Sequence, residues 1–382
     1  ASKTFRGLFF KRMGIFLFNT KTATLRKRYQ HYHNRKHLQF VFSLVMGCAG
    51  RLFWFRRIMR WLDMSLSPKG FFKKIFNEYK PHLVFSTDIQ NENDISVMQA
   101  ARIRGVPIIG MLRSWDNVTQ RIIRVLPDKL FVGSQALFDE VVELYRYPRE
   151  KTVITGNPHY DIYRKGPTSS KENFFKEWGF DPYKKTILYA PVGNILININ
   201  DIDQHVMEVL GTVDANILVR FPPDEDIRFI NFQKPARMKF DRPGVVFKSG
   251  EFGDREIRKS DDERLVNSIF WSDLVITGPT SICLDAAFFD KPVIAVNFYP
   301  KPRNFYDSVW SYKCNHIQKL LATGGVKYTE SKEEFLGAIQ AYFKDPKQDT
   351  ASRAMIRSLW FSHADGKAGD HIANVILQCI RL

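Results

Sequence analysis

A strand-like apolar run passes into a helix-like segment through the turn TGPTS at residues 277–281. At such a junction the helix dipole and unpaired amides favour an anion, glycine permits close backbone approach, and hydroxyls can donate hydrogen bonds. An acid one helical turn further on could accept hydrogen bonds from a bound sugar. The pattern predicts a binding site for phosphate groups, although a proline and a threonine here would also begin an ordinary helix. The residues assigned to this phosphate site are Gly278, Pro279, Thr280, Ser281 and Asp285.

A second group of candidates follows strand-like runs in the first half of the chain. Asp116 comes directly after the run at 106–112, and it is the first choice for a general base that deprotonates a hydroxyl. Asp88 and His159 follow neighbouring runs and are the alternative bases. An Asx-turn or a solvated loop histidine would explain the same residues without catalysis. The molecule that carries this hydroxyl, the acceptor, is expected to contact Ser114, Trp115, Asn117 and Asn157. The Trp115 ring would stack against a sugar.

Two further positions favour an anion in the second half of the chain. Gly193 and Asn194 follow the run at 186–191, where their backbone amides could face a ligand, and Arg220 ends the run at 216–221. Two Asp-x-Asp triplets, at 201–203 and 224–226, could bind a metal. An acid at 201 or 203 is better explained as a helix cap, so no metal site is expected.

The elements that must position these residues alternate in type along the chain. Strand-like runs at 83–86, 106–112, 129–133 and 152–155 are separated by helical segments, and a second series runs at 186–191, 216–221, 244–248, 273–277 and 292–296. Such alternation is typical of βαβ units with parallel sheets. We expect two α/β domains of Rossmann type facing a cleft, at 1–163 and 185–382, joined by a Gly-, Pro- and Ser-rich linker at 164–184.

The charge of +17 is concentrated near the start of the chain. Residues 1–80 hold 18 Lys and Arg against two acids, a net +16, whereas the remaining 302 residues hold 39 against 38. The segment predicts an anionic partner, such as the inner face of a membrane. Its longest weakly charged stretch, 38–50, is short for a spanning helix and leaves an interfacial or a buried helix open. Arginines interleaved with aromatic residues would also suit nucleic acid, but no known nucleic-acid module is recognisable.

The four cysteines show neither a CxxC pair nor histidines at metal-binding spacing. No apolar segment followed by a small-residue cleavage site is visible at the start of the chain. We therefore expect a cytoplasmic protein that is peripheral on the membrane.

Three segments carry a family resemblance. DLVITGPTSICLDAAFFDKPVIAV at 273–296 resembles the donor-binding element of GT-B glycosyltransferases and their relatives, which include the CDP-glycerol glycerophosphotransferases and the UDP-GlcNAc 2-epimerase group. The stretch from 127 to 161 resembles the end of the first domain in these proteins, and HADGKAGDHIANVI at 363–376 resembles the ending of glycerophosphotransferase-like members. Two departures are Phe221-Pro222, where those members usually have His-Pro, and Asp285, where Glu is common.

The resemblance implies a GT-B fold whose last helix returns to the first domain, and a transferase that needs no metal or other cofactor. Our leading expectation is a sugar transferred from a nucleotide-sugar donor to a surface polysaccharide or glycolipid acceptor. A polyol-phosphate transferase of the CDP-glycerol type and a nucleotide-sugar 2-epimerase are the alternatives on the same fold. A basic nucleic-acid-binding protein is the alternative outside enzymes.

Overall fold

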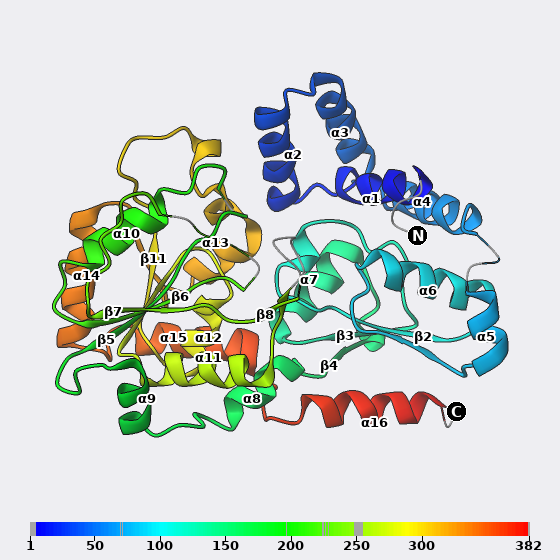
Figure 1. Cartoon of the computed structure of the whole chain (residues 1–382). Helices are drawn as coiled ribbons and strands as arrows, with labels where there is room; N and C mark the ends of the chain where they lie inside the picture. Colours follow the sequence, from blue (N-terminus) through cyan, green and yellow to red (C-terminus); the bar gives the residue numbers. More distant parts are fainter. Residues whose placement is uncertain are drawn as a thin grey trace. The chain divides into compact units, whose positions relative to one another are not determined.

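The computed structural model describes residues 5–68, 70, 72–195, 197–223, 225, 227, 229–247 and 255–380. The chain forms two compact units, which are described separately (Figure 1). The first unit contains the chain up to Asp161, Lys313–His316 and the chain from Leu359 onward. The second contains Ile162–Tyr312 and Ile317–Ser358. The expected return of the C-terminal helix to the first unit is therefore confirmed.

The first unit is built on a parallel sheet in the order β1-β2-β3-β4. Its strands lie within the apolar runs that predicted them: β1 (Val84–Ser86), β2 (Ile108–Met111), β3 (Lys129–Val132) and β4 (Thr152–Ile154). Two helices connect them, α6 (Glu92–Ile103) and α7 (Gln135–Tyr145). Ser134 begins α7 as expected, because its hydroxyl accepts a hydrogen bond from the Leu137 amide.

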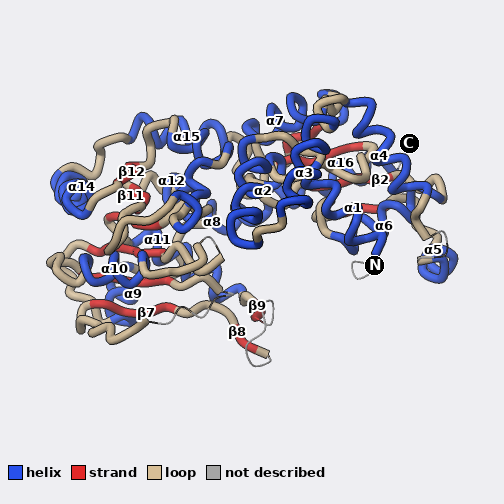
Figure 2. The backbone as a smooth tube through the Cα atoms, turned by 90° about the horizontal axis from the view of Figure 1, so that it is seen from above, coloured by secondary structure: helices blue, strands red, loops and turns tan. Residues whose placement is uncertain are grey.

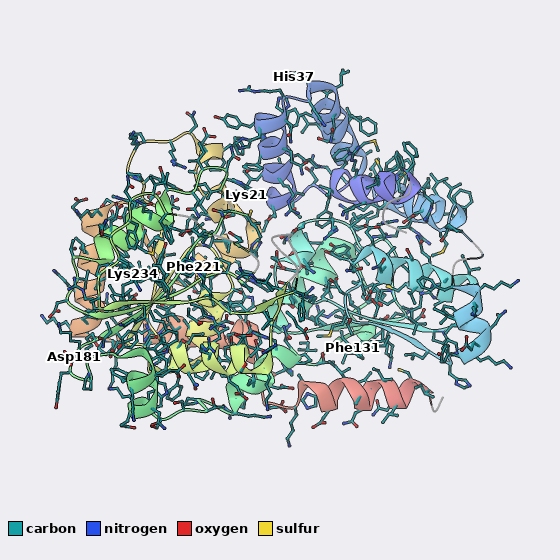
Figure 3. The ribbon with its side chains drawn as sticks, viewed as in Figure 1. Lys21, His37, Phe131, Asp181, Phe221 and Lys234 are labelled. Carbon is teal, nitrogen blue, oxygen red and sulfur yellow. The ribbon has the colours of Figure 1, made fainter. Side chains whose placement is uncertain are left out.

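The two faces of this sheet are covered by different parts of the chain. α16 (Ala368–Ile380) lies along one face, where Ile372 packs with Ile109, Met111 and Phe131 (Figure 1). Phe131, which belongs to β3, is fully buried (Figure 3). The opposite face packs against α6 and α7, and the core there extends into the N-terminal helices.

Five helices precede the first strand: α1 (Phe5–Phe16), α2 (Lys21–Asn34), α3 (His37–Ala49), α4 (Phe53–Ser65) and α5 (Lys73–Tyr79). α1, α2 and α3 contact one another (Figure 2). Buried residues of α1 and α4, including Phe10, Met13 and Met59, join the core of the sheet. The helices are thus part of the first unit rather than an independent tail.

A buried ion network fixes α1 and α4 to the sheet. Asp63 of α4 is 2% exposed. It accepts two hydrogen bonds from Arg124, at 2.8 and 3.0 Å, and one from Arg6 of α1 at 2.6 Å. Arg124 also pairs with Glu92 at the start of α6, at 2.7 Å. Four segments far apart in sequence therefore share one set of paired charges.

α3 differs from a core helix. Of its thirteen residues, Ser43 and Gly47 are buried, whereas Leu38 is 89% exposed and Val45 is 59% exposed. Trp54, Ile58 and Trp61 of α4 are also exposed. The alternative of an ordinary buried helix at 38–50 is therefore wrong. No single described helix has the length and apolarity to cross a membrane, and α3 and α4 meet that criterion only as a pair bent by 114°.

The second unit is built on a parallel sheet in the order β12-β11-β10-β5-β6-β7. Its strands are β5 (Thr186–Ala190), β6 (Asn216–Arg220), β7 (Met238–Asp241), β10 (Leu274–Thr277), β11 (Val293–Val296) and β12 (Lys327–Thr329). Every residue of β5, β6, β10 and β11 is buried. Continuous apolar runs are expected where both faces of a parallel sheet are covered. The helices are α9 (Lys171–Trp178), α10 (Ile202–Leu210), α11 (Lys259–Trp271), α12 (Ile282–Phe288), α13 (Asn315–Leu321), α14 (Lys332–Lys344) and α15 (Thr350–Phe361). The start of α13, up to His316, and the end of α15, from Leu359, belong to the first unit.

Three expectations for this unit need correction. The run at 244–248 is not a strand of the main sheet, because Val245–Val246 (β8) pairs antiparallel with Arg255–Glu256 (β9). The strand beside β6 is instead β7, and β12 follows β11; neither was expected. The expected linker at 164–184 contains α9, whose first turn is capped by Ser170.

We predict that Asp63→Asn will destabilise the first unit by about 3–5 kcal/mol, because Arg6 loses its paired carboxylate and buried Arg124 keeps Glu92 alone as its countercharge. Denaturant-dependent hydrogen exchange, read on peptides from α1 and α4, measures the loss. Asp214→Asn is the matched control, since Asp214 pairs with Lys184 at the surface and its loss should change little. Equal protection of α1 and α4 in wild type and Asp63→Asn would show that the network does not hold these helices.

Candidate functional site

The centre of the first unit's site is the loop after β2. Asp116 precedes a short 3-10 turn at Asn117–Thr119. Its carboxylate accepts a hydrogen bond from the side-chain amide of Gln120. The Gln120 side-chain oxygen accepts from Arg26 of α2 at 2.6 Å. A carboxylate, an amide and a guanidinium thus form one chain of hydrogen bonds, to which the N-terminal helices contribute the cation.

His316 completes this cluster from a segment 200 residues further along the chain. Its ring meets the Trp115 ring edge to face at 4.9 Å, and Trp115 also meets Trp360 at 6.1 Å. Burial lowers the pKa of His316 below its ordinary value of 6.5, the nearby Asp116 charge acts to raise it, and Arg26 lowers it further. The imidazole is therefore neutral at pH 7, and a neutral imidazole can accept a proton.

Within the described residues, the buried His316 Nδ1 has no hydrogen-bond partner. Asn315 beside it is fixed, because its side-chain oxygen accepts from the Thr22 amide at 2.8 Å. Residues 315 and 316 are thus held by α2, the helix that also supplies Arg26.

The loop after β1 joins the same cluster. Gln90 donates to the Asn117 carbonyl at 3.2 Å and accepts from Arg121 at 3.2 Å. Asp88 accepts from the Gln90 amide at 3.1 Å and lies 4.0 Å from Arg113. Gln90 thus links the loop that holds Asp88 to the residue that follows Asp116, while the roles of Asp88 and Asp116 as bases stay predictions.

His159 and Asn157 occupy a different setting. His159 is exposed, its ring contacts Tyr160, and Tyr160 packs on Phe361. The Asn157 side chain accepts from the His159 amide at 3.1 Å. A role for His159 as base stays a prediction.

In the second unit, the backbone amides after β5 donate hydrogen bonds to carboxylates of the protein. The Gly193 amide donates to buried Asp203 at 3.1 Å, and the Asn194 amide donates to Glu225. Asp203 also accepts from the Val192 amide and from the Tyr189 hydroxyl, each at 2.7 Å. Burial raises the pKa of the Asp203 carboxyl, against the effect of these hydrogen bonds. The expectation that the Gly193 and Asn194 amides are available to a ligand is therefore corrected. Asp203, which was expected to cap the following helix, instead binds the amides of this loop.

The 277–281 turn packs against that loop. A Cβ on Gly278 would lie 2.7 Å from Cγ2 of Val192, so glycine is needed here for the close approach of the Val192 side chain; its expected contact with phosphate stays a prediction. The Thr277 and Thr280 hydroxyls hydrogen-bond to each other at 2.9 Å, while Ser281 is exposed at the start of α12. Asp285 is 3% exposed, and its expected contact with a ligand stays a prediction.

Arg220 is also used internally. It pairs with Asp241, which is fully buried and also accepts from Arg264 at 3.1 Å, and it donates to the Asp261 carbonyl at 2.8 Å. The expected role of Arg220 as a phosphate ligand is therefore corrected. Phe221 beside it is a core residue (Figure 3). Its ring meets the Phe240 ring edge to face. The Asp224 and Asp226 carboxylates of the second triplet lie outside the described residues.

The fold has two Rossmann-like units in the GT-B arrangement of elements. Residues 123–378, more than half of the chain, match the family described as CDP-glycerol:poly(glycerophosphate) glycerophosphotransferase, and the chain belongs to that family. Comparison with curated proteins finds no significant match.

Solved structures give the same fold. The chain resembles S. aureus MnaA in its UDP co-structure, with 18% identity, a TM-score of 0.53 and coverage of 85% of this chain and 82% of that one. It also resembles a UDP-GlcNAc 2-epimerase from Neisseria meningitidis bound to UDP-GlcNAc, with 14% identity, a TM-score of 0.51 and coverage of 80% and 78%. At such identities the likeness concerns the fold alone.

The lowered pKa of His316 predicts a specific pH dependence of stability. Between the folded pKa and 6.5 the unfolded chain binds more protons at this position, so the stability contribution is present above pH 6.5 and is lost as pH falls through the folded value. His316→Gln should therefore flatten the fall of the melting temperature between pH 7.5 and 5. His82→Gln, at an exposed histidine, is the control and should leave the slope unchanged. An unchanged slope in His316→Gln would contradict the neutral, buried assignment.

Proposed function

We propose that the protein transfers glycerol phosphate from CDP-glycerol to a poly(glycerophosphate)-type acceptor. The family match over residues 123–378 carries this proposal, and it favours the polyol-phosphate alternative over the sugar transfer first expected. Phe221, where a histidine is usual in glycerophosphotransferase-like members, argues for donor contacts that differ in detail. The fold likeness to 2-epimerases supports no epimerase activity by itself.

The proposed reaction is a phosphoryl transfer with a simple balance. An acceptor hydroxyl oxygen attacks the glycerol-bearing phosphorus, a new P–O bond forms, the pyrophosphate P–O bond breaks, and CMP leaves. The hydroxyl proton must pass to a base, and the leaving phosphate must be stabilised by positive charge. In our proposal Asp116 accepts the proton.

Neighbouring groups support that role. Neutral His316 stands beside Asp116 as a second proton acceptor, and Trp115 limits access of water. Arg26 and Arg121 supply positive charge. Burial is the larger cause that lowers the pKa of Arg26, and the nearby charge of Arg121 lowers it further. Gln120 links Arg26 to Asp116 and so positions both.

We further propose that the enzyme acts as a peripheral protein on an anionic membrane surface at the cytoplasmic face. The exposed apolar side chains of α3 and α4 and the net charge of residues 1–80 support this placement. Apolar insertion and attraction of Lys and Arg to anionic lipids reinforce each other, at about 1 kcal/mol for each basic side chain near the surface.

The nucleotide product tests the proposed function. Purified enzyme given CDP-glycerol and a glycerophosphate-primed lipid acceptor should release CMP, and Asp116→Asn should lower turnover by roughly 100-fold or more with donor affinity nearly unchanged. His316→Gln should lower turnover less, because Asp116 keeps its proton-accepting role. Product analysis by ion-pair chromatography separates CMP from nucleoside diphosphates.

Two control variants and a second donor show which results would contradict this proposal. Asp88→Asn and His159→Ala should retain most activity; an inactive His159→Ala beside an active Asp116→Asn would move the base to the loop after β4. Release of UDP or another nucleoside diphosphate from a nucleotide sugar, with CDP-glycerol inert, would restore sugar transfer and refute the proposal.

Membrane placement is tested by flotation with vesicles. Val45→Ser with Trp61→Ser should weaken binding to vesicles of phosphatidylglycerol and phosphatidylcholine by about 10-fold or more, because two apolar side chains no longer enter the bilayer. Tyr183→Ser with Ile230→Ser removes two still more exposed side chains from the second unit and should have no effect. Equal flotation of the two double variants would refute insertion of α3 and α4.

A further inference from the structure

A cavity of about 240 Å³ opens among the N-terminal helices α1, α2 and α3, away from Asp116 and its cluster. It is smaller than the ~300–1,000 Å³ typical of pockets for drug-sized ligands. The size suits a small polar group rather than a nucleotide sugar. Its polar lining is Arg12, Lys27, Gln30, His31, Lys36 and Gln39, with Asn34 and Ser43 beside them.

The charge of this cavity is positive and has no internal compensation. No acidic residue lines it. Residues 1–80 hold two acids, and Asp63 is committed to Arg6 and Arg124. The exposed side chains of Arg12 and Lys36 have no ion-pair or hydrogen-bond partner among the described residues. An uncompensated cluster of this kind attracts an anion.

Lys27 contributes charge from the floor of the cavity. Its ammonium donates to the Phe16 and Phe18 carbonyls at 2.8 and 2.9 Å, so it holds the end of α1 rather than offering free donors. Burial lowers the pKa of Lys27 to about 8. An anion nearby would favour its charged form and raise that pKa.

His31 adds a directional group. Its ring stacks on Phe40 at 4.3 Å and contacts His37 at 4.8 Å. Its Nδ1 is buried, and it has no hydrogen-bond partner among the described residues. Buried polar atoms are normally satisfied, so this nitrogen points to a partner that binds in the cavity.

The cavity and the exposed apolar face share α3. Gln39, Phe40 and Ser43 line the cavity, whereas Leu38 and Val45 of the same helix face outward. His37 marks the outer end of α3 (Figure 3). A helix whose apolar side chains enter the acyl layer brings its neighbouring polar side chains to the depth of the head groups.

We propose that this cavity binds the phosphate head group of an anionic phospholipid. The head-group phosphate lies between Arg12 and Lys36, and His31 and the amides of Gln30 and Gln39 contact its oxygens or the attached glycerol. This inference deepens the proposed membrane placement and rests on it. It assigns the basic segment a specific lipid contact in addition to its general attraction to anionic surfaces.

The test uses a soluble lipid and a pair of charge-matched variants. Dihexanoyl phosphatidylglycerol, kept below its micelle concentration, is titrated into the full chain by calorimetry. Arg12→Gln with Lys36→Gln should weaken its binding by about 10-fold or more. Arg28→Gln with Arg57→Gln removes the same charge from exposed positions outside the cavity and should change binding less than 2-fold.

The outcomes separate this site from the membrane placement. Wild type that floats with anionic vesicles but fails to bind the soluble lipid, or two double variants that weaken binding equally, would overturn the head-group site alone. Inorganic phosphate binding as tightly as the lipid would also overturn it, in favour of a general anion site. Wild type that does not float with anionic vesicles would overturn the membrane placement itself.

Discussion

The buried carboxylate of Asp63 is the interaction on which the arrangement of the first unit depends. Residues 1–80 are so basic that their helices repel one another and any cationic neighbour, and Asp63 places a countercharge where Arg6 and Arg124 converge. With α1 and α4 fixed to the sheet, α2 is positioned so that Arg26 reaches Gln120. The same packing leaves the apolar face of α3 outward. One buried charge thus supports both the proposed active site and the proposed membrane surface.

The parallel sheets were predictable because their strands are apolar on both faces. The runs that become β5, β10 and β11 contain no charged residue, and β6 contains a charged residue at its last position, Arg220. Burial of both faces of a sheet favours such apolar runs. β7 was missed because Met238–Asp241 alternates apolar and charged residues at a sheet edge. Its Asp241 is nevertheless buried, since Arg220 and Arg264 neutralise it.

The candidate site was harder to predict, because its partners come from distant parts of the sequence. A local pattern could indicate Asp116 and Trp115 after a strand, but not that Arg26 and His316 would join them. The same limit explains the errors at Gly193, Asn194 and Arg220. The sequence suggested that the two backbone amides and the guanidinium could bind a ligand. In the fold they bind the carboxylates of Asp203, Glu225 and Asp241 instead.

The net charge of the N-terminal segment overstates what it can present to a membrane. Arg56 donates to the Gly50 and Leu144 carbonyls, Arg60 donates to the Ile123 carbonyl, and Lys27 is held by α1. These cations serve the packing of the segment on the sheet, and burial lowers the pKa of Arg60 to about 10. In the proposed membrane placement, attraction to lipid comes from the exposed remainder, including Arg12 and Lys36. That remainder is smaller than the net charge suggests, so the proposal assigns much of the binding energy to the exposed apolar side chains of α3 and α4, and the selection of an anionic surface to the basic residues.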